Sequence, residues 1–540
     1  METPLPLTRD LVLVGGGHAH ALVLRRWGMR PLPGARLTLI DPLVKAPYTG
    51  MLPGFVAGHY AREEVEIDLV RLARFAGARL VRGRVAGIDR TARRLLVPGR
   101  PPVAYDVASL DIGISAPVPP IEGGEYIAPA KPFGAFAAAF DRFLEEVHAG
   151  RAPEAVILGG GVAGAELALA VAHRLRTEAG RAAVTLVERA PEILTEVAPA
   201  TRQLLARALE AAGIAVRAGQ GLSRLDGEAV WIGEARIPAG FVAATTGAGP
   251  APWLAETGLD LTDGFVTVGA TLQSSDPAIF AAGDIAHMAE SPRVKAGVFA
   301  VRQGPVLAES LRRALTGWPP RRFRPQARYL KLISMGDRTA VADKWGFSLS
   351  GPWVWRWKDR IDRRFMDRFA RLPAMTPPRP AEVASGAAGA EPLCGGCGSK
   401  LGQGALTRAL SALPPAARAD VVTGPGDDAA VLALPGGGRQ VITHDHLRAF
   451  WDDPYVMARI AALHALGDVW AMGAAPQAML AAVTLPRMAE GMAEATLAEI
   501  LAAARQVAEE AGAALVGGHT TQGAEMVLGF TVTGLTERPV

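Results

Sequence analysis

The two cysteines of this 540-residue chain, Cys394 and Cys397, stand close to Lys400 in the string LCGGCGSK. A thiol three residues from a lysine, in a glycine-rich turn, is exposed and favoured in its thiolate form, which predicts a reactive cysteine. Two alternatives compete with this interpretation. The pair could form half of a zinc site that takes further ligands from His or carboxylate side chains, or a glycine turn without chemistry.

Aspartates follow the cysteines in a pattern that suits a hard metal ion. Asp428 lies in GDDAAV, Asp445 ends QVITHD, and Asp468 precedes a glycine bend in GDVWAMG. Mg²⁺ binds carboxylate oxygens together with waters and phosphate oxygens. One such Asp alone would be an ordinary helix N-cap, but the set predicts a site for magnesium with nucleotide phosphates. Gly517 and Gly518 of ALVGGHT would allow the phosphates to approach closely.

A different chemistry is indicated near the N-terminus, where DLVLVGGGHAHALVL predicts a buried strand, a glycine turn and a helix. Gly15 and Gly17 fit the first two positions of G-x-G-x-x-G, which lets N–H groups at a helix N-terminus approach a pyrophosphate. The third position holds His20, so helix and strand must separate slightly or the imidazole must point aside. Asp41, at the end of the strand RLTLID, is placed to bind ribose hydroxyls.

A complete copy of this unit begins at residue 155 with AVILGGGVAGAELAL and reaches the strand VTLVER. Gly159, Gly161 and Gly164 fill the three glycine positions, and Glu188 fills the acidic one. Two such units predict two dinucleotide-binding domains. The Glu188 carboxylate would repel a 2′-phosphate, which favours NADH over NADPH, although the neighbouring Arg189 keeps NADPH as an alternative.

The order GGGHAH, GGGVAGAE and FAAGDIA resembles the two-dinucleotide flavoproteins over about residues 8–370. The resemblance implies FAD on the first loop, NAD(P)H on the second, and contact of Asp284 with the ribityl chain of FAD. Within that superfamily, KAPYTGMLPGFVAG is similar to a segment of type II NADH dehydrogenases and sulfide:quinone reductases. Lys45 and Pro47 would then lie near the isoalloxazine, with an ordinary Pro-rich loop as the alternative.

The electron acceptor of this first part must come from outside it. Disulfide reductases of this architecture use a cysteine pair beside the flavin, and residues 1–393 contain no cysteine. We therefore expect the flavin to pass electrons to a quinone, to oxygen or to a chalcogen compound, with the protein supplying alignment and electrostatics.

The C-terminal motifs resemble selenophosphate synthetase, or selenide, water dikinase, of the aminoimidazole ribonucleotide synthetase superfamily. The C-G-x-K turn of that family matches Cys397 and Lys400. The resemblance implies that Asp428 and Asp468 hold Mg²⁺, that Asp445 lies near the nucleotide, and that ATP and selenide yield selenophosphate, AMP and phosphate.

This second resemblance has two departures. His464 stands where the family has Asn. The family also has a second half with another metal-binding Asp, so the sequence predicts a truncated synthetase domain.

Composition and length predict several α/β domains. With 57 basic and 53 acidic residues the charge is balanced, which argues against a nucleic-acid partner. The expected fold is α/β: two Rossmann-like domains, followed by an α+β aminoimidazole ribonucleotide synthetase-like N-terminal domain. We expect an oxidoreductase module at 1–372, a linker at 373–392 and the synthetase-like domain at 393–540. Within the first module, FAD takes 8–150 and 265–310, NADH takes 151–264, and a closing segment spans 325–370.

The string WVWRWKDRIDRRFMDRF is open to two interpretations. Tryptophans that alternate with cations are typical of peripheral membrane helices, and a closing helix that packs its aromatics inward is the alternative.

The two C-terminal cysteines favour a reducing compartment, so we expect a cytoplasmic protein. The synthetase resemblance further implies a homodimer formed through the C-terminal domain. The first function hypothesis is a fusion that supplies reduced selenium to a synthetase. The second is a membrane-surface NADH:quinone reductase with an inactive C-terminal domain. The third is a C-terminal block that acts as a non-catalytic nucleotide-sensing or dimerisation domain.

Overall fold

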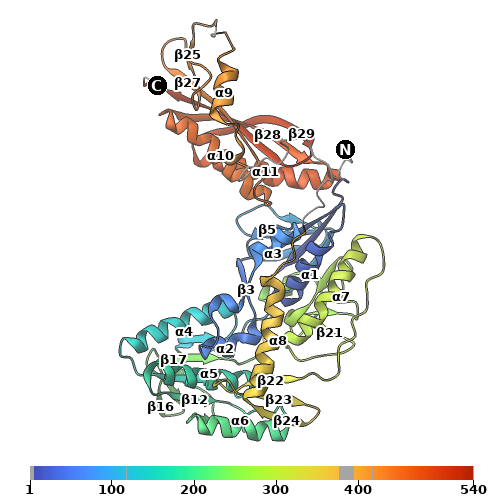
Figure 1. Cartoon of the computed structure of the whole chain (residues 1–540), viewed down its shortest axis with the longest axis vertical. Helices are drawn as coiled ribbons and strands as arrows, with labels where there is room; N and C mark the ends of the chain where they lie inside the picture. The colour runs from blue at the N-terminus through green and yellow to red at the C-terminus, as the bar shows by residue number, and fades with distance from the viewer. Residues whose placement is uncertain are drawn as a thin grey trace.

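The computed structural model describes residues 5–116, 118, 120–247, 249–375, 395–414 and 417–538. Cys394 and most of the predicted linker lie outside these residues, and so does the side chain of Cys397. The described chain forms two mixed α/β units, followed by a separate C-terminal unit (Figure 1).

The first unit is a five-stranded parallel sheet in the order β20-β9-β1-β2-β5. Its strands are β20 (Ile279–Ala281), β9 (Val107–Leu110), β1 (Arg9–Val14), β2 (Ala35–Asp41) and β5 (Arg79–Arg82). Helices α1 (His18–Met29), α3 (Leu69–Ala76) and α7 (Gly297–Leu315) pack beside it. The central strand forms because Leu11, Val12 and Leu13 are all fully buried, which is typical of a parallel strand covered on both faces.

The second unit repeats this arrangement in the order β10-β17-β11-β12-β13. Its strands are β10 (Ile127–Pro129), β17 (Phe241–Ala244), β11 (Glu154–Leu158), β12 (Ala183–Val187) and β13 (Ala215–Arg217). Helices α4 (Phe133–His148), α5 (Val162–Ala179) and α6 (Pro199–Ala211) belong to this unit. The second sheet thus begins at β10, before the predicted division at residue 150, because β10 hydrogen-bonds to β17.

Smaller elements complete the oxidoreductase part of the chain. A two-stranded sheet pairs β3 (Lys45–Pro47) with β4 (Glu66–Asp68), and the short helix α2 (Leu52–Val56) lies between them in the chain. A three-stranded sheet consists of β6 (Gly87–Asp89), β7 (Arg94–Leu96) and β8 (Val103–Ala104), and another of β14 (Arg224–Leu225), β15 (Ala229–Ile232) and β16 (Ala235–Pro238). A further one consists of β18 (Leu261–Thr262), β19 (Phe265–Val268) and β21 (Ala286–Met288).

A closing layer follows, with strands β22 (Lys331–Ser334), β23 (Ala340–Lys344) and β24 (Phe347–Gly351), and helix α8 (Pro352–Ala370). Figure 1 shows α8 running alongside both units.

The C-terminal unit is a six-stranded sheet in the order β25-β26-β27-β30-β28-β29, with helices α10 (Pro454–Ala471) and α11 (Glu490–Glu510) on one face. Its strands are β25 (Val421–Thr423), β26 (Ala430–Ala433), β27 (Arg439–Arg448), β28 (Ala475–Pro486), β29 (Ala514–Gly523) and β30 (Val527–Thr536), and α9 (Gln403–Leu410) precedes them. The α+β class of this unit and the α/β class of the two Rossmann-like units confirm the predicted fold class.

Candidate functional sites

The first glycine loop is held in shape by its own acid. Gly15, with φ +89°, turns the chain between β1 and α1. Asp41 Oδ2 accepts a hydrogen bond from the main-chain N–H of Gly16 at 2.6 Å, and Oδ1 accepts one from Leu43 at 2.7 Å. Asp41 therefore fixes the loop at the end of β2, where the sequence predicted a ribose contact.

The second loop is held by its acid in the same way. Glu188 Oε2 accepts from Gly160 N–H at 2.6 Å, and Oε1 accepts from Ala190 N–H at 2.8 Å. Burial raises the pKa of Glu188, but hydrogen bonds from the main chain outweigh burial and hold it below its ordinary value. Gly159 has φ +106°, and a Cβ on Gly164 would lie 1.8 Å from the Gly159 carbonyl oxygen. The glycine positions predicted for this loop thus have steric causes.

A carboxylate outside the glycine motifs faces the N-terminus of α1. Asp111 Oδ2 accepts hydrogen bonds from the N–H groups of Ala19 at 2.9 Å and His20 at 3.0 Å. A Cβ on Gly17 would lie 2.3 Å from Asp111 Cγ. Gly17 therefore makes room for Asp111, whereas the sequence motif predicted only that Gly17 lets a phosphate approach. The sequence feature that could have pointed to Asp111 is its position directly after the apolar strand VASL.

Burial raises the pKa of Asp111 to about 7, against the hydrogen bonds from His20 and Ala19 and with the added charges of Asp284 and Asp41. An aspartate in this range carries a proton for part of the time near neutral pH. The site is therefore compatible with the pyrophosphate of a dinucleotide, which a fixed negative charge would repel.

Glu196 is the corresponding carboxylate at α5. Its Oε1 accepts from Val162 N–H at 2.6 Å, and a Cβ on Gly161 would lie 2.8 Å from the same oxygen. Glu196 is exposed, in contrast to the buried Asp111. An exposed side chain can rotate away from an incoming phosphate at little cost.

His20 is a buried structural residue and not a ligand of a phosphate. Its Nδ1 lies 2.7 Å from the Gly15 carbonyl oxygen and its Nε2 lies 2.8 Å from Ser109 Oγ. Burial lowers the pKa of His20 to about 4, so the ring is neutral at pH 7. The imidazole points aside and bridges the turn after β1 to strand β9, which was one of the two predicted arrangements.

The predicted flavin contacts Asp284 and Lys45 have different surroundings. Asp284 forms an ion pair with Lys131 at 3.0 Å, and Lys131 lines a large cavity between the two dinucleotide units. Lys45 pairs with Glu66 at 3.2 Å and is not among the residues that line this cavity. The carbonyl oxygen of Pro47 lies 3.3 Å from Nε2 of His18, which does line it.

The cavity has a volume of about 930 Å³, which is within the range of cofactor and substrate sites. Residues of the first unit, of α5 and of α8 meet in it. Basic side chains outnumber acidic ones in its wall: Lys131, Lys295, Arg302, Arg328, Lys344, Lys358, Arg364 and Arg368 against Glu166 and Asp362.

Glu166 is the titratable group of α5 in this wall. Its Oε1 accepts from Ser334 N–H at 2.6 Å. Burial raises the pKa of Glu166 to about 7, with the Lys358 charge opposing. A carboxyl with such a pKa can donate or accept a proton near neutral pH. The sequence offered a signal for it, the acid of GGGVAGAE, to which no role was assigned.

A separate group of hydrogen-bonded side chains lies on α8, in the same cavity wall. Lys358 Nζ donates to Asp362 Oδ2 at 2.7 Å and to the Gly50 carbonyl oxygen at 2.8 Å, and Tyr48 Oη donates to Asp362 Oδ1 at 3.1 Å. The Tyr48 ring also packs on Phe365, with centroids 4.6 Å apart. Helix α8 therefore supplies charged groups to the cavity, besides packing Phe365.

In the C-terminal unit, Asp445 on β27 lies beside the side chains of Lys400 and His464. Lys400 Nζ lies 3.6 Å from Asp445 Oδ1, and His464 Nε2 lies 3.3 Å from Oδ2. The glycine turn docks beside this strand, since Arg448 N–H donates to the Gly395 carbonyl oxygen at 3.1 Å. Of the predicted catalytic pair, Lys400 is thus placed at an aspartate. The backbone of Cys397 begins a single 3₁₀ turn, Cys397–Ser399.

The three predicted metal ligands lie near one another, and Thr443 contacts two of them. Its hydroxyl donates to Asp468 Oδ2 at 2.7 Å and lies 3.2 Å from the Asp428 carbonyl oxygen. Burial raises the pKa of Asp468, and the charges of Asp445 and Asp428 raise it further. These side chains are close enough to repel one another. Among the described residues, however, no three His, Cys, Asp or Glu side chains already have the spacing of a metal site.

The glycines Gly517 and Gly518 lie in the edge strand β29. Gly517 has φ +155°, at a point where the pairing of β28 with β29 shifts its register. A Cβ on Gly518 would lie 2.0 Å from the Ala481 carbonyl oxygen. The structure thus gives both glycines a role in strand pairing, beside the phosphate approach predicted for them.

The two parts of the chain are similar to different known proteins. Over 146 residues, which are 26% of its length, this chain is 41% identical to a selenide, water dikinase of Nitratidesulfovibrio vulgaris (strain DSM 19637 / Miyazaki F). Over 142 residues it is 39% identical to one of Desulfitobacterium hafniense (strain Y51). Each match covers 41% of the relative, so the chain spans about two fifths of the length of these curated relatives.

Two solved structures share the fold of the oxidoreductase part. The sulfide:quinone oxidoreductase of Aquifex aeolicus superposes with a TM-score of 0.56 and 16% identity, over 67% of this chain and 91% of that one. NDH2 from Plasmodium falciparum, in complex with NADH, gives 0.56 and 12%, over 67% and 98%.

Family profiles agree with both parts of the chain. The N-terminal domain of AIR synthase related proteins matches residues 426–536. The pyridine nucleotide-disulphide oxidoreductase profile matches residues 9–304, more than half of the chain. The protein therefore belongs to the pyridine nucleotide-disulphide oxidoreductase family and carries an AIR synthase-related domain behind it, which confirms the predicted fusion of two enzyme modules.

Proposed function

We propose that the first module is an FAD-dependent NADH oxidoreductase. The observation that carries this proposal is the pair of acid-braced glycine loops, Asp41 with Gly16 and Glu188 with Gly160, which belong to the two units that wall one cavity. The loop of α1 would hold FAD and the loop of α5 would hold NADH. When bound, FAD supplies hydride acceptance from the nicotinamide.

Residues of the cavity wall would serve this chemistry in specific ways. Lys131, held by Asp284, would place a positive charge where a reduced flavin carries a negative one. Glu166 would exchange protons with the bound acceptor. The ion pair of Lys358 with Asp362 would hold the cavity wall around that acceptor in place. Glu188, held below its ordinary pKa by main-chain N–H groups, would repel a 2′-phosphate and so select NADH.

The charge of the cavity wall supports an anionic acceptor. Eight basic side chains face two acidic ones in it. A selenium or other chalcogen anion would be attracted to this wall, whereas a neutral quinone would gain nothing from the charges. No thiol relay is available, because residues 1–393 contain no cysteine, so electrons would pass directly to this acceptor.

For the second module we propose selenide, water dikinase activity, which forms selenophosphate, AMP and phosphate from ATP, selenide and water. Lys400 would stabilise the charge of the transferring phosphoryl group, and Cys397 would handle selenium. Asp428, Asp445 and Asp468 would bind Mg²⁺ with the ATP phosphates. The identity to selenide, water dikinases over this region supports the proposal.

One preparation tests both activities: the protein expressed to the stop codon of its gene. We expect a flavin absorption spectrum that is bleached by NADH, and AMP release from ATP with selenide. Cys397→Ser should lose AMP release and keep the flavin reaction. AMP release in neither protein would disprove the dikinase proposal, and a protein that binds no flavin would disprove the first one.

We further propose a cytoplasmic homodimer that pairs through the C-terminal domain. β29 is an edge strand and most of its side chains are exposed, and the sheet face opposite α10 and α11 presents Leu480 at 44% exposure. An unpaired edge strand can pair with the same strand of a second copy. Sedimentation equilibrium of the wild type and of Leu480→Lys tests it, because the charged variant should shift toward the monomer.

A membrane-surface NADH:quinone reductase is the second candidate. It is favoured by exposed aromatic side chains on β24, on the turn before it and on α8, namely Trp345, Phe347, Trp353 and Trp357. Across the described segments, no helix has both the length and the apolar character needed to cross a bilayer. Flotation with liposomes and quinone-dependent NADH oxidation, with Phe347→Asp as the control, would distinguish this candidate from the first.

A further inference from the structure

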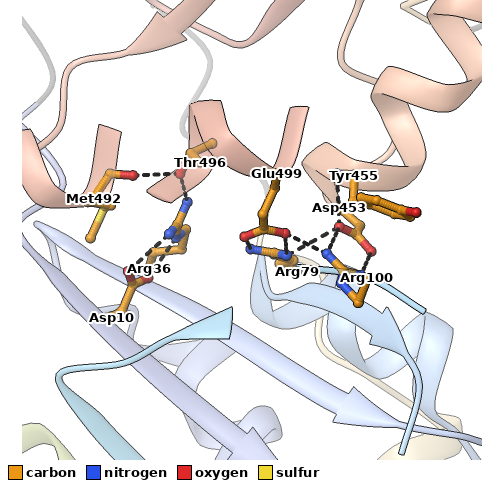
Figure 2. A network of polar contacts seen from close by, with 9 residues as sticks. All are labelled: Asp10, Arg36, Arg79, Arg100, Asp453, Tyr455, Met492, Thr496 and Glu499. Atoms are coloured by element: carbon orange, nitrogen blue, oxygen red, sulfur yellow. Dashed lines mark hydrogen bonds and ion pairs between the residues drawn. The ribbon is translucent and has the colours of Figure 1, made fainter. Parts of the chain in front are cut away.

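Four buried charges lie where the C-terminal unit meets the oxidoreductase (Figure 2). The oxidoreductase contributes Arg79, at the start of β5, and Arg100, in the turn before β8. The C-terminal unit contributes Asp453, the N-cap of α10, and Glu499 of α11. Their side chains are only 3%, 6%, 1% and 4% exposed, respectively. Burial of this extent is unusual for charged groups and requires that each one has its partner.

Each of the four charged groups has partners across the contact, although the Nε atoms of Arg79 and Arg100 are buried without a hydrogen-bond partner among the described residues. Arg100 donates to both carboxylate oxygens of Asp453, at 2.6 and 2.9 Å, and to Glu499 at 2.5 Å. Arg79 donates to both oxygens of Glu499, one of them at 3.0 Å, and to Asp453 at 3.3 Å. Two guanidinium groups and two carboxylates thus form a neutral cluster. The planar fork of each arginine matches the carboxylates in one orientation only, which specifies how the two units fit.

The surrounding contacts continue the same fit. Arg36 is held by Asp10 at 2.7 Å and directs its remaining nitrogen to Thr496 Oγ1 at 2.8 Å. Tyr455 lies under Arg100, whose guanidinium carbon is 5.0 Å from the ring centroid. These side chains come from β2, α10 and α11, so the contact surrounds the charged cluster on several elements (Figure 2).

The main chain takes part as well. Leu7 N–H donates to the Arg487 carbonyl oxygen at 2.9 Å, and Ala489 N–H donates to the Leu7 carbonyl oxygen at 2.7 Å. The segment before β1 is therefore paired to the segment before α11, as in a short parallel ladder.

We propose that β2, β5 and the turn before β8 form a docking site for the α10–α11 face of the AIR synthetase-related domain, which holds the two modules together without the connecting residues 376–394. The partner is defined by its chemistry: an aspartate that caps one helix beside a glutamate on the next, matched to two arginines. Close charge pairs of this kind contribute affinity and exclude partners that lack them. This proposal is independent of the reactions proposed above.

The test uses the full chain with a protease site inserted between residues 380 and 390. After cleavage, we expect the two pieces to elute together in size-exclusion chromatography and to remain together at moderate salt, because the ion pairs are buried. Pieces that separate after cleavage of the otherwise wild-type chain would overturn the proposal.

Two matched variants locate the contact. Arg100→Glu places a third carboxylate in the cluster, and it leaves the oxidoreductase core untouched because Arg100 lies in a turn and bonds to the C-terminal unit. Its cleaved pieces should elute separately. Arg94→Glu changes an exposed arginine of β7 in the same small sheet and should leave one peak. If the Arg100→Glu pieces also stay together, while circular dichroism shows both variants folded, the charged cluster does not hold the modules and the proposal is wrong.

Discussion

The carboxylate of Asp111 accepts a hydrogen bond from the main-chain N–H of Ala19 at 2.9 Å and so occupies the N-terminus of α1, where dinucleotide-binding folds receive a pyrophosphate. An acid and a diphosphate compete for the same positive end of a helix. How this competition is resolved depends on the proton that Asp111 carries.

The stability of the folded protein should depend on that proton. Burial raises the pKa of Asp111 to about 7 in the folded protein, whereas its pKa in the unfolded chain is about 4. The contribution to the free energy of unfolding is therefore fully present below about pH 4 and is lost as the pH rises through about 7. Asp111→Asn should remove this slope, as measured by urea unfolding at several pH values. Glu63→Gln, an exposed control, should retain it.

Binding of FAD should take up a proton. The diphosphate adds negative charge beside Asp111 and favours its neutral form, so the affinity for FAD should decrease above pH 7, approaching about tenfold per pH unit. Asp111→Asn keeps an oxygen acceptor for Ala19 and His20 and should bind FAD with little dependence on pH. Fluorescence titration of the apoprotein measures both. An equal pH dependence in wild type and variant would contradict the role given to Asp111.

Glu166→Gln should separate the two halves of the flavin cycle. We expect NADH turnover with an acceptor that takes up protons to fall about 10²-fold and to lose its inflection near pH 7, because the amide cannot exchange a proton. Reduction of the bound flavin by NADH, followed by stopped flow without acceptor, should change little. Loss of both steps would show that Glu166 acts in assembly of the site and not in proton transfer.

Glu188→Gln tests the choice of coenzyme. The amide oxygen can still accept from Gly160 or Ala190, but the negative charge is gone. The ratio of kcat/KM for NADH over NADPH should therefore decrease about tenfold, equivalent to about 1.4 kcal/mol. Steady-state kinetics with both coenzymes measures it, and an unchanged ratio would assign the preference to other residues.

Asp468→Asn tests the aspartate cluster of the C-terminal unit. Without metal, the variant should melt at a slightly higher temperature than the wild type, and its free energy of unfolding should be higher by less than about 1 kcal/mol. The reason is that Asp468 no longer repels Asp445 and Asp428, while the amide oxygen still accepts from Thr443. Addition of Mg²⁺ with ATP should raise the melting temperature of the wild type only. Equal stabilisation of both proteins would place the metal elsewhere.

The fold class and the two glycine loops could be predicted from the sequence because their determinants are local. A glycine with positive φ, such as Gly159, and an acid at the end of the next strand lie within one βαβ unit. The sequence pattern therefore contains the geometry. Asp41 and Glu188 were identified in this way, although their hydrogen bonds to the loops were not.

The groups that the sequence did not reveal depend on contacts between distant segments. Asp111 meets α1 only because β9 lies beside β1 in the sheet. His20 is explained by Ser109, which lies on the same neighbouring strand. Arg79 and Glu499 are 420 positions apart, and nothing in either local string marks a buried pair. Residue spacing cannot report such contacts, because they are products of the tertiary fold.

The buried cluster at the module contact also has a thermodynamic consequence for the whole chain. If one module unfolded alone, the guanidinium or carboxylate pair of the other would lose its partners, so partial unfolding is penalised and the two modules should melt in one cooperative transition. A molecule bound to either module then protects both. Occupancy of the FAD site would therefore delay heat inactivation of the C-terminal unit. This protection would extend to α9, which Figure 1 shows at the end of that unit that points away from the oxidoreductase.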